Sequence, residues 1–151
     1  MYWIIFTFII IIDQATKYLV LKNFTLYESK PIIEGIFHLT YVRNIGAAFS
    51  ILQNQRTFFI IATSIVVIVI FWYILSKKYL NNIVLYSLIL IAGGAVGNLI
   101  DRVRFGYVVD FFDFMIWPVF NIADMSIVIG SILLSYYYIF LDKAPKLERK
   151  K

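Results

Sequence analysis

Four long apolar runs, separated by polar segments, set the pattern of this chain. They cover residues 2–21, 57–76, 83–102 and 124–141. Each run has the length, roughly 17–25 residues, that an α-helix needs to cross the hydrocarbon core of a bilayer. The pattern therefore predicts a single membrane domain, residues 1–151, with four transmembrane helices.

The longer polar segments are residues 22–56 and 104–123. Apolar and polar residues alternate in IFHLTYV, residues 36–42, which predicts a short β-strand. Pro31 and Gly35 precede this stretch and RNIGAAF follows it, so turns are expected on both sides. We expect a small β-cradle between the first and second helices of an otherwise all-α integral membrane protein.

The composition supports a membrane protein and narrows its chemistry. Apolar residues make up 62% of the chain and charged residues 15%, whereas soluble domains contain about 25% charged residues. The chain has no cysteine, and His38 is its single histidine. Disulfides, Cys-zinc sites and thiol nucleophiles are therefore excluded. With one histidine, a His-based metal cluster or a Ser-His triad is not expected, and we expect no metal or organic cofactor.

The basic residues predict the orientation of the helices. Lys77 and Lys78 occupy the connection between the second and third runs, and five more basic residues lie in the tail 142–151. By the positive-inside rule both termini are cytoplasmic, and segments 22–56 and 104–123 face outward. We attribute the net charge of +5 to basic residues that orient the helices in the membrane, with the tail as an anchor at the membrane surface. We therefore predict no nucleic-acid partner.

A cleaved signal peptide is the alternative interpretation of the first run. Signal peptides have basic residues ahead of an uninterrupted apolar stretch. The first run has no basic residue before it and contains Asp13 and Lys17. We interpret it as a permanent helix, in which Asp13 and Lys17, four residues apart, form a structural polar pair inside the membrane.

The same spacing of polar residues, Asn-x-x-Asp, recurs at the outward ends of the third and fourth helices. Asn98 and Asp101 are separated by two residues, as are Asn121 and Asp124. With a rise of about 1.5 Å per residue from Ile83, the first pair lies roughly 22–27 Å along its helix, near the outer edge of a ~30 Å hydrocarbon layer. The fourth helix begins at that surface, so the two pairs are expected to meet at one depth.

Each of these residues also has a purely structural interpretation. Asn121 or Asp124 can cap the fourth helix, and Asp101 can form an ion pair with the adjacent Arg102. Several carboxylates and amides at one membrane depth are costly, however, and such residues usually serve a function. Two neighbouring carboxylates that share one proton can act as acid and base toward water, which indicates an aspartic hydrolase. From the repeated spacing alone, Asp101 would pair with Asp124.

Five blocks in order resemble the prokaryotic lipoprotein signal peptidases (signal peptidase II). They are DQATK (13–17), RNIGAAFS (43–50), GGAVGNLIDR (93–102), VVDF (108–111) and FNIAD (120–124). The resemblance covers almost the whole chain. It implies a four-helix membrane aspartyl endopeptidase with an outward-facing β-cradle, which removes signal peptides from prolipoproteins just before a diacylglyceryl-modified cysteine. It also implies that Asp110, in place of Asp101, forms the catalytic pair with Asp124.

The remaining polar residues receive supporting roles. Asn98, Asp101 and Asn121 are expected to support the catalytic pair. The resemblance implies that Asn44 and Arg102 orient the substrate, and the position of the Gly46 loop after the outer strand suits substrate contact. Asp113 is outside the five blocks and is interpreted as a loop acid. The implied partners are diacylglyceryl-modified prolipoprotein signal peptides and membrane lipids. We predict a monomer in the bacterial cytoplasmic membrane, with its active site at the outer leaflet interface.

Two other classes of protein fit parts of the pattern. In a small ion-coupled transporter, acids and amides at helix ends bind protons or cations, but polar residues should then line a path across the membrane. The second run has no charge, and most acids lie toward one membrane face. In a non-enzymatic membrane scaffold, function would survive the loss of both carboxylates.

Overall fold

The computed structural model describes residues 2–46 and 55–142, and within them the four predicted helices are confirmed. All four are long and apolar enough to cross a membrane. They are α1 (Tyr2–Asn23), α2 (Arg56–Ser76), α3 (Asn82–Phe105) and α4 (Ile122–Tyr136), the last continuing as the π-helical turn η2 (Tyr137–Leu141). The predicted basic tail after Asp142, and the AAFS part of the RNIGAAFS block, lie outside the described residues.

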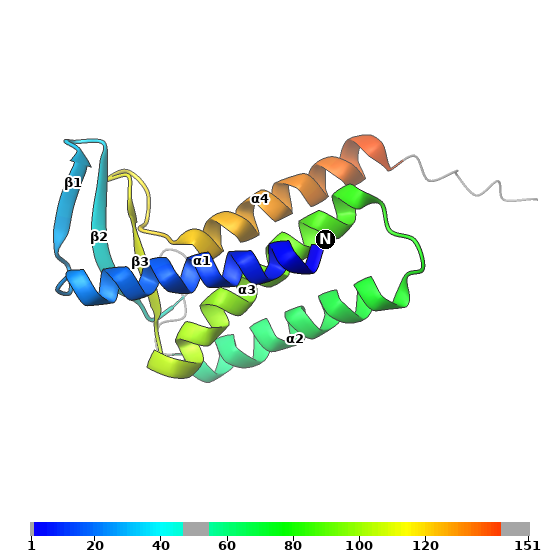
Figure 1. The fold of residues 1–151 in the computed structure, drawn as a ribbon, viewed down its shortest axis with the longest axis horizontal. Helices are drawn as coiled ribbons and strands as arrows, with labels where there is room; N and C mark the ends of the chain where they lie inside the picture. The colour runs from blue at the N-terminus through cyan, green and yellow to red at the C-terminus, as the bar shows by residue number, and fades with distance from the viewer. Residues whose placement is uncertain (1, 47–54, 143–151) are drawn as a thin grey trace, which may run out of the picture.

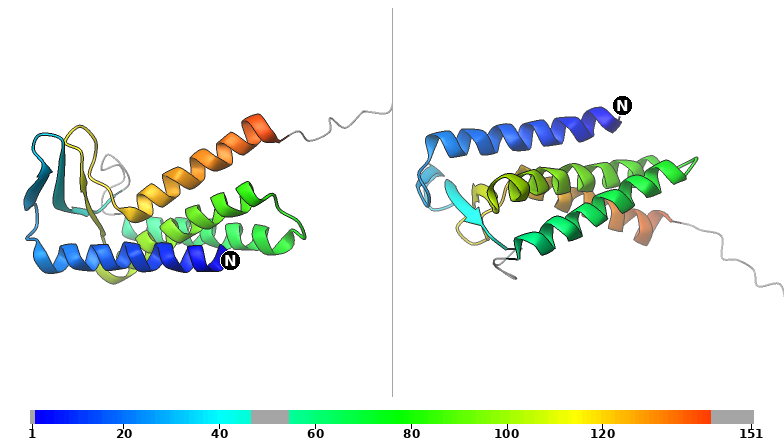
Figure 2. Two further views of the ribbon diagram at one scale, coloured as in Figure 1. Left: turned by 45° about the horizontal axis from the view of Figure 1, so that its top comes forward. Right: turned by 90° about the horizontal axis from the view of Figure 1, so that it is seen from below.

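α3 is the central helix of the bundle. It packs against α1, α2 and α4, and it is the most buried of the four helices (Figures 1 and 2). α2 instead exposes branched apolar side chains such as Ile61, Ile65 and Ile68. These faces match a hydrocarbon environment, in which apolar side chains on the surface carry no cost.

Glycines allow α3 to approach its neighbours closely. A Cβ atom at Gly93 would lie 3.2 Å from the side chain of Ile9 on α1, and one at Gly94 would collide with the backbone carbonyl of Ala123 on α4. A Cβ at Gly97 would lie only 2.6 Å from a carboxylate oxygen of Asp13. Small residues therefore bring α1 and α4 close enough to α3 for their polar groups to meet.

A three-stranded antiparallel sheet lies at one end of the bundle, with the order β1-β2-β3 (Figure 1). Its strands are β1 (Ser29–Ile33), β2 (Phe37–Asn44) and β3 (Val108–Asp113). The predicted strand 36–42 corresponds to β2. The sheet was expected between the first two helices, but only β1 and β2 lie there, and β3 comes from the segment between α3 and α4. Alternation did not reveal β3 because residues 108–111 are all buried.

Two features attach the sheet to the helices. Val20 of α1 packs against Tyr41 of β2 and against Val109 and Phe111 of β3 in a buried apolar cluster. Gly106, with φ of +83°, ends α3 in a left-handed conformation that favours glycine. This tight turn places β3 directly after the end of α3, so Asp110 returns toward the end of the bundle that bears Asn98 and Asp101.

Candidate active site

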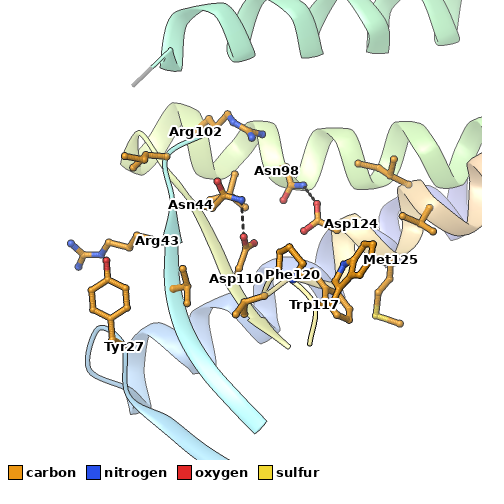
Figure 3. A pocket seen from close by; sticks show the side chains of 17 residues that line it. Tyr27, Arg43, Asn44, Asn98, Arg102, Asp110, Trp117, Phe120, Asp124 and Met125 are labelled. Carbon is orange, nitrogen blue, oxygen red and sulfur yellow. Dashed lines mark hydrogen bonds between the residues drawn. The ribbon is translucent and has the colours of Figure 1, made fainter. Parts of the chain in front are cut away.

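A cavity of about 890 Å³ lies between the sheet and the ends of α3 and α4 (Figure 3). Asp110 of β3 and Asp124 of α4 both line it, together with Asn44, Asn98 and Arg102. The other lining residues include the apolar side chains Trp117, Phe120, Met125 and Val128. Two carboxylates, two asparagine amides and two arginines, Arg43 and Arg102, therefore line one largely apolar cavity.

Asp110 is held on both of its carboxylate oxygens by amides. Asn121 Nδ2 donates to Oδ1 at 2.6 Å, and Asn44 Nδ2 donates to Oδ2 at 2.9 Å. The residue is only 1% exposed. Burial, followed by the negative charge of Asp124, raises the pKa of Asp110 to about 7, and the two amide hydrogen bonds offset part of this effect. Asp110 can therefore retain a proton near neutral pH.

Asp124 lies in the first turn of α4 and forms a capping box with Asn121. Asp124 N donates to Asn121 Oδ1 at 2.9 Å, and Asn121 N donates to Asp124 Oδ2 at 3.2 Å. Its other oxygen, Oδ1, accepts from Asn98 Nδ2 at 2.7 Å. The interpretation of Asn121 as a helix cap is thus correct. It does not exclude a functional role, because the same Asn121 side chain also binds Asp110.

The two Asn-x-x-Asp segments meet, as their expected depth indicated. Asn121 Nδ2 donates to Asn98 Oδ1 at 3.2 Å, so the two amides link α3 to the start of α4. Asn98 is in turn bound to Asp124, and Asn121 to Asp110. Each carboxylate therefore has an amide of its own, and the two amides hold each other in place.

A buried cation connects α1 to this arrangement. Lys17 Nζ lies 2.9 Å from Asp13 and 3.0 Å from Asp101, and it donates to Asn98 Oδ1 at 2.9 Å. The alternative that Asp101 pairs with Arg102 is wrong, because Asp101 is buried against Lys17. Asp101 Oδ2 also accepts from the backbone N–H of Val109 at 3.1 Å. This hydrogen bond fixes β3 at Val109, the residue before Asp110. Asp101 itself does not line the cavity.

Gln14 is a half-buried contributor that the sequence patterns did not reveal. Its Nε2 donates to Asp101 Oδ1 at 2.9 Å, to Asp13 Oδ2 at 3.2 Å and to the carbonyl of Gly97 at 3.2 Å. Asp13 also accepts from the backbone N–H of Ala123 at 2.9 Å. The signal available in the sequence was the position of Gln14 between the ionisable residues Asp13 and Lys17 of an apolar run.

The three residues expected to orient substrate are bonded to one another, and two of them, Asn44 and Arg102, line the cavity. An Arg102 guanidinium nitrogen donates to the carbonyl of Gly46 at 3.1 Å, and Gly46 N donates to Asn44 Oδ1 at 3.0 Å. Asn44 also binds Asp110. In Figure 3, Asn44 and Asp110 lie on one side of the cavity, and Asn98 and Asp124 on the other. The end of β2 is thereby tied to both α3 and β3.

Other polar residues lie away from the two aspartates. Asp113 ends β3, where it accepts from Thr40 Oγ1 at 2.7 Å and from Met115 N at 2.8 Å. His38 shares a hydrogen bond of 3.0 Å with Ser29 on the sheet. Within residues 2–46 and 55–142, no three His, Cys, Asp or Glu side chains are grouped so that they would hold a metal ion. The two carboxylates that line the cavity, Asp110 and Asp124, can serve as an acid and a base.

Comparison with known sequences relates the chain to a family of peptidases. A family profile described as signal peptidase (SPase) II matches residues 5–140. A lipoprotein signal peptidase of Halothermothrix orenii is 51% identical over 137 residues, which cover 91% of this chain and 94% of the relative. A lipoprotein signal peptidase of Caldanaerobacter subterraneus is 52% identical over 138 residues, with the same 91% and 94% covered.

Comparison with solved structures gives a matching result. A bacterial membrane enzyme determined by the in meso method at 2.3 Å resolution has a TM-score of 0.88 at 36% identity, covering 99% of this chain and 93% of that one. A second, at 1.9 Å resolution, has a TM-score of 0.83 at 36% identity, covering 95% and 94%. The arrangement of four apolar helices and a three-stranded sheet is shared with membrane enzymes of known structure.

Proposed function

The chain belongs to the signal peptidase II family, and from this premise we propose that it cleaves prolipoproteins immediately before a diacylglyceryl-modified cysteine. The observation that carries the proposal is the pair of carboxylates, the buried Asp110 and the half-buried Asp124, which line one cavity and are each held by amides. Relatives named lipoprotein signal peptidase match more than nine-tenths of the chain, which supports the substrate class.

We further propose an aspartic mechanism with no covalent intermediate. Ionised Asp124 takes a proton from a water molecule, whose oxygen attacks the scissile carbonyl carbon. Protonated Asp110 donates its proton to the developing oxyanion. When the tetrahedral intermediate collapses, the carbon–nitrogen bond breaks, the proton on Asp124 passes to the leaving amine, and a hydroxyl of the intermediate returns a proton to Asp110. The raised pKa of Asp110 supports its assignment as the acid of the pair.

The neighbouring residues receive positioning roles in this proposal. Asn98 and Asn121 fix the two carboxylates through hydrogen bonds that a dry site strengthens. Asn44 and Arg102 orient the substrate backbone from the cavity wall, and Gly46, bonded to both, holds them in place. Asp101 acts through its bonds to Lys17 and Val109 and does not touch the substrate.

We also propose that the chain is one monomeric domain in the bacterial cytoplasmic membrane. Both termini would be cytoplasmic, because the connection between α2 and α3, which contains Lys77 and Lys78, lies at the end of the bundle away from the sheet, as does the C-terminal end of η2 (Figure 1). The sheet and the cavity would then lie at the outer leaflet interface. Prolipoproteins emerging on that side would reach the two aspartates without crossing the membrane.

Cleavage of a lipidated precursor tests the function directly. We expect the purified protein to cut a diacylglyceryl-modified precursor and to leave the same unmodified precursor intact, because the lipid would seat beside the apolar part of the cavity. Gel mobility before and after incubation measures the reaction. A folded protein that cuts neither precursor would contradict the peptidase proposal, and proton-coupled ion flux in vesicles would then favour a transporter.

The pH dependence tests the assignment of Asp110 as the acid. Its pKa of about 7 means that the required proton is lost as the pH rises above that value. We expect kcat/KM to fall about tenfold per unit above about pH 8. Initial rates on the lipidated precursor over a series of buffers give the profile, and a constant rate through that range would contradict the assignment.

The pH dependence of stability gives an independent measure of the raised pKa of Asp110. The pKa of Asp110 is raised on folding from 3.8 to about 7, so its contribution to stability is complete below pH 3.8 and is lost as the pH rises through about 7. Asp110→Asn cannot titrate and should remove this part of the pH dependence. Thermal unfolding of both proteins in detergent makes the comparison.

A further inference from the structure

Three arginines surround the turn that joins α3 to β3, residues 105–107. Arg43 lies over the ring of Tyr107 at 4.9 Å, and Arg104 lies over the ring of Phe105 at 5.0 Å. The side chain of Arg56 passes Gly106, where a Cβ atom would lie 3.6 Å from it. All three arginines are exposed, so a short turn at the sheet end of the bundle carries three positive charges.

The arginines and aromatic rings form a continuous row of contacts. Tyr107 stacks on Phe105 with ring centroids 5.7 Å apart and an angle of 23° between the planes. Arg43 also donates from Nε to the hydroxyl of Tyr41 at 2.9 Å. These contacts orient the guanidinium groups and leave most of their N–H donors available, because a guanidinium carries five.

Within the part of the chain that the structure describes, none of these arginines forms an ion pair with a carboxylate. Arg56 caps α3 by donating to the carbonyls of Arg102 and Val103 at 2.9 and 2.8 Å. The nearest acids in sequence, Asp101 and Asp110, are buried and bound to other groups. The positive charge of this surface is therefore not neutralised by the described residues of the chain.

The guanidinium of Arg43 lies away from the two aspartates. Arg43 is among the residues that line the cavity, but Figure 3 shows its guanidinium extending away from Asp110 and Asp124, while the neighbouring Asn44 points toward Asp110. Alternate residues of a strand face opposite sides of a sheet, which explains the difference. The row of arginines and rings therefore begins at Arg43 beside the cavity and continues away from the two aspartates, over the turn after α3.

The depth of this surface indicates its partner. α2 begins at Arg56 and α3 ends at Phe105, so the turn lies where two membrane-spanning helices leave the hydrocarbon. Phosphate groups of lipids lie at this depth. Val103 and Phe105, 54% and 37% exposed, provide apolar surface beside the arginines, so the patch matches an amphiphile with an anionic head and apolar chains.

We propose that Arg43, Arg104, Phe105 and Tyr107, with the charge of Arg56, bind the headgroup of an anionic phospholipid. The guanidinium groups would donate to the phosphodiester oxygens, and the acyl chains would follow the exposed side of α3. A zwitterionic headgroup is disfavoured because its own cation would face the arginines. This binding site does not depend on the peptidase reaction and is measured without turnover.

Lipid affinity of the purified full-length protein tests the proposal. Fluorescently labelled phosphatidylglycerol and the matching phosphatidylcholine are titrated into the detergent-solubilised protein, and anisotropy is recorded. We expect a preference for phosphatidylglycerol. The variant Arg43→Gln/Arg104→Gln should lose roughly 25-fold in affinity for it, at about fivefold per charge. Arg43→Lys/Arg104→Lys should retain most of the preference, which separates lost charge from lost folding.

Lys77→Gln/Lys78→Gln is the matched control, since it removes the same charge at the opposite end of the bundle. Its affinity for phosphatidylglycerol should stay at the wild-type value. An equal loss in this control would show a general charge effect and overturn the proposal. An unchanged preference in the arginine-to-glutamine variant would overturn it as well. So would competition by inorganic phosphate at the same concentration as the lipid, because the ligand would then be a free anion.

Discussion

Asparagine in place of either Asp110 or Asp124 is expected to lower kcat on a lipidated precursor about a thousandfold or more. The substitution preserves the size of the side chain and removes its ability to exchange a proton with water or with the oxyanion. The two carboxylates act as a unit, so the double variant should lose little more activity than either single variant. Single-turnover cleavage, followed on gels, gives the rates.

Two other aspartates of the same region serve as controls. Asp113→Asn changes a residue on the same strand as Asp110, but its partners are Thr40 and Met115, so near-wild-type activity is expected. Asp101→Asn should retain part of the activity, because Asp101 contacts Lys17 and Val109 and does not line the cavity. Thermal unfolding of each variant shows whether a loss of activity reflects a loss of fold.

The activities of these variants identify which two aspartates form the catalytic pair. If Asp110→Asn cut normally while Asp101→Asn did not, the catalytic pair would be Asp101 and Asp124, as the repeated Asn-x-x-Asp spacing alone suggests. If the double variant of Asp110 and Asp124 kept full biological function, a non-catalytic scaffold would be the better description. The proposed mechanism requires that both single variants are inactive and folded.

Methionine in place of Lys17 is expected to lower the free energy of unfolding by about 3–5 kcal/mol. Lys17 is 2% exposed and is the cation that faces both Asp13 and Asp101. Methionine fills a similar volume but leaves two buried carboxylates without a countercharge. Unfolding of the detergent-solubilised protein by a graded addition of denaturing detergent measures the change.

Further variants distinguish the effect of unpaired buried charges on stability from the effect of losing a lysine. Lys22→Met alters an exposed lysine near the end of the same helix and should change the stability by less than about 0.5 kcal/mol. Adding Asp13→Asn and Asp101→Asn to Lys17→Met leaves no unpaired charge and should recover part of the stability. Equal stability of Lys17→Met and the wild type would show that the buried ion pairs are energetically unimportant.

The sequence by itself determined the membrane-spanning helices. About twenty apolar residues in succession are a local property, and the thickness of the hydrocarbon layer imposes that length on any spanning helix. The one strand found from the sequence, β2, has alternation that is likewise visible locally. The convergence of Asn98 and Asn121 also followed from local information, because helix rise and topology place both residues at one depth.

Only the tertiary structure decided how the polar residues are used. β3 pairs with β2 across a separation of more than sixty residues, as with Asn44 and Val108, and its buried residues show no alternation. The contacts of Lys17 with Asp101, of Gln14 with the same residue, and of Arg102 with Gly46 also join distant segments. No local pattern records such pairs, because their energies depend on which groups the packed helices bring together. That packing puts Asp110 beside the cavity and buries Asp101 against a lysine, although both are acids near the same helix end.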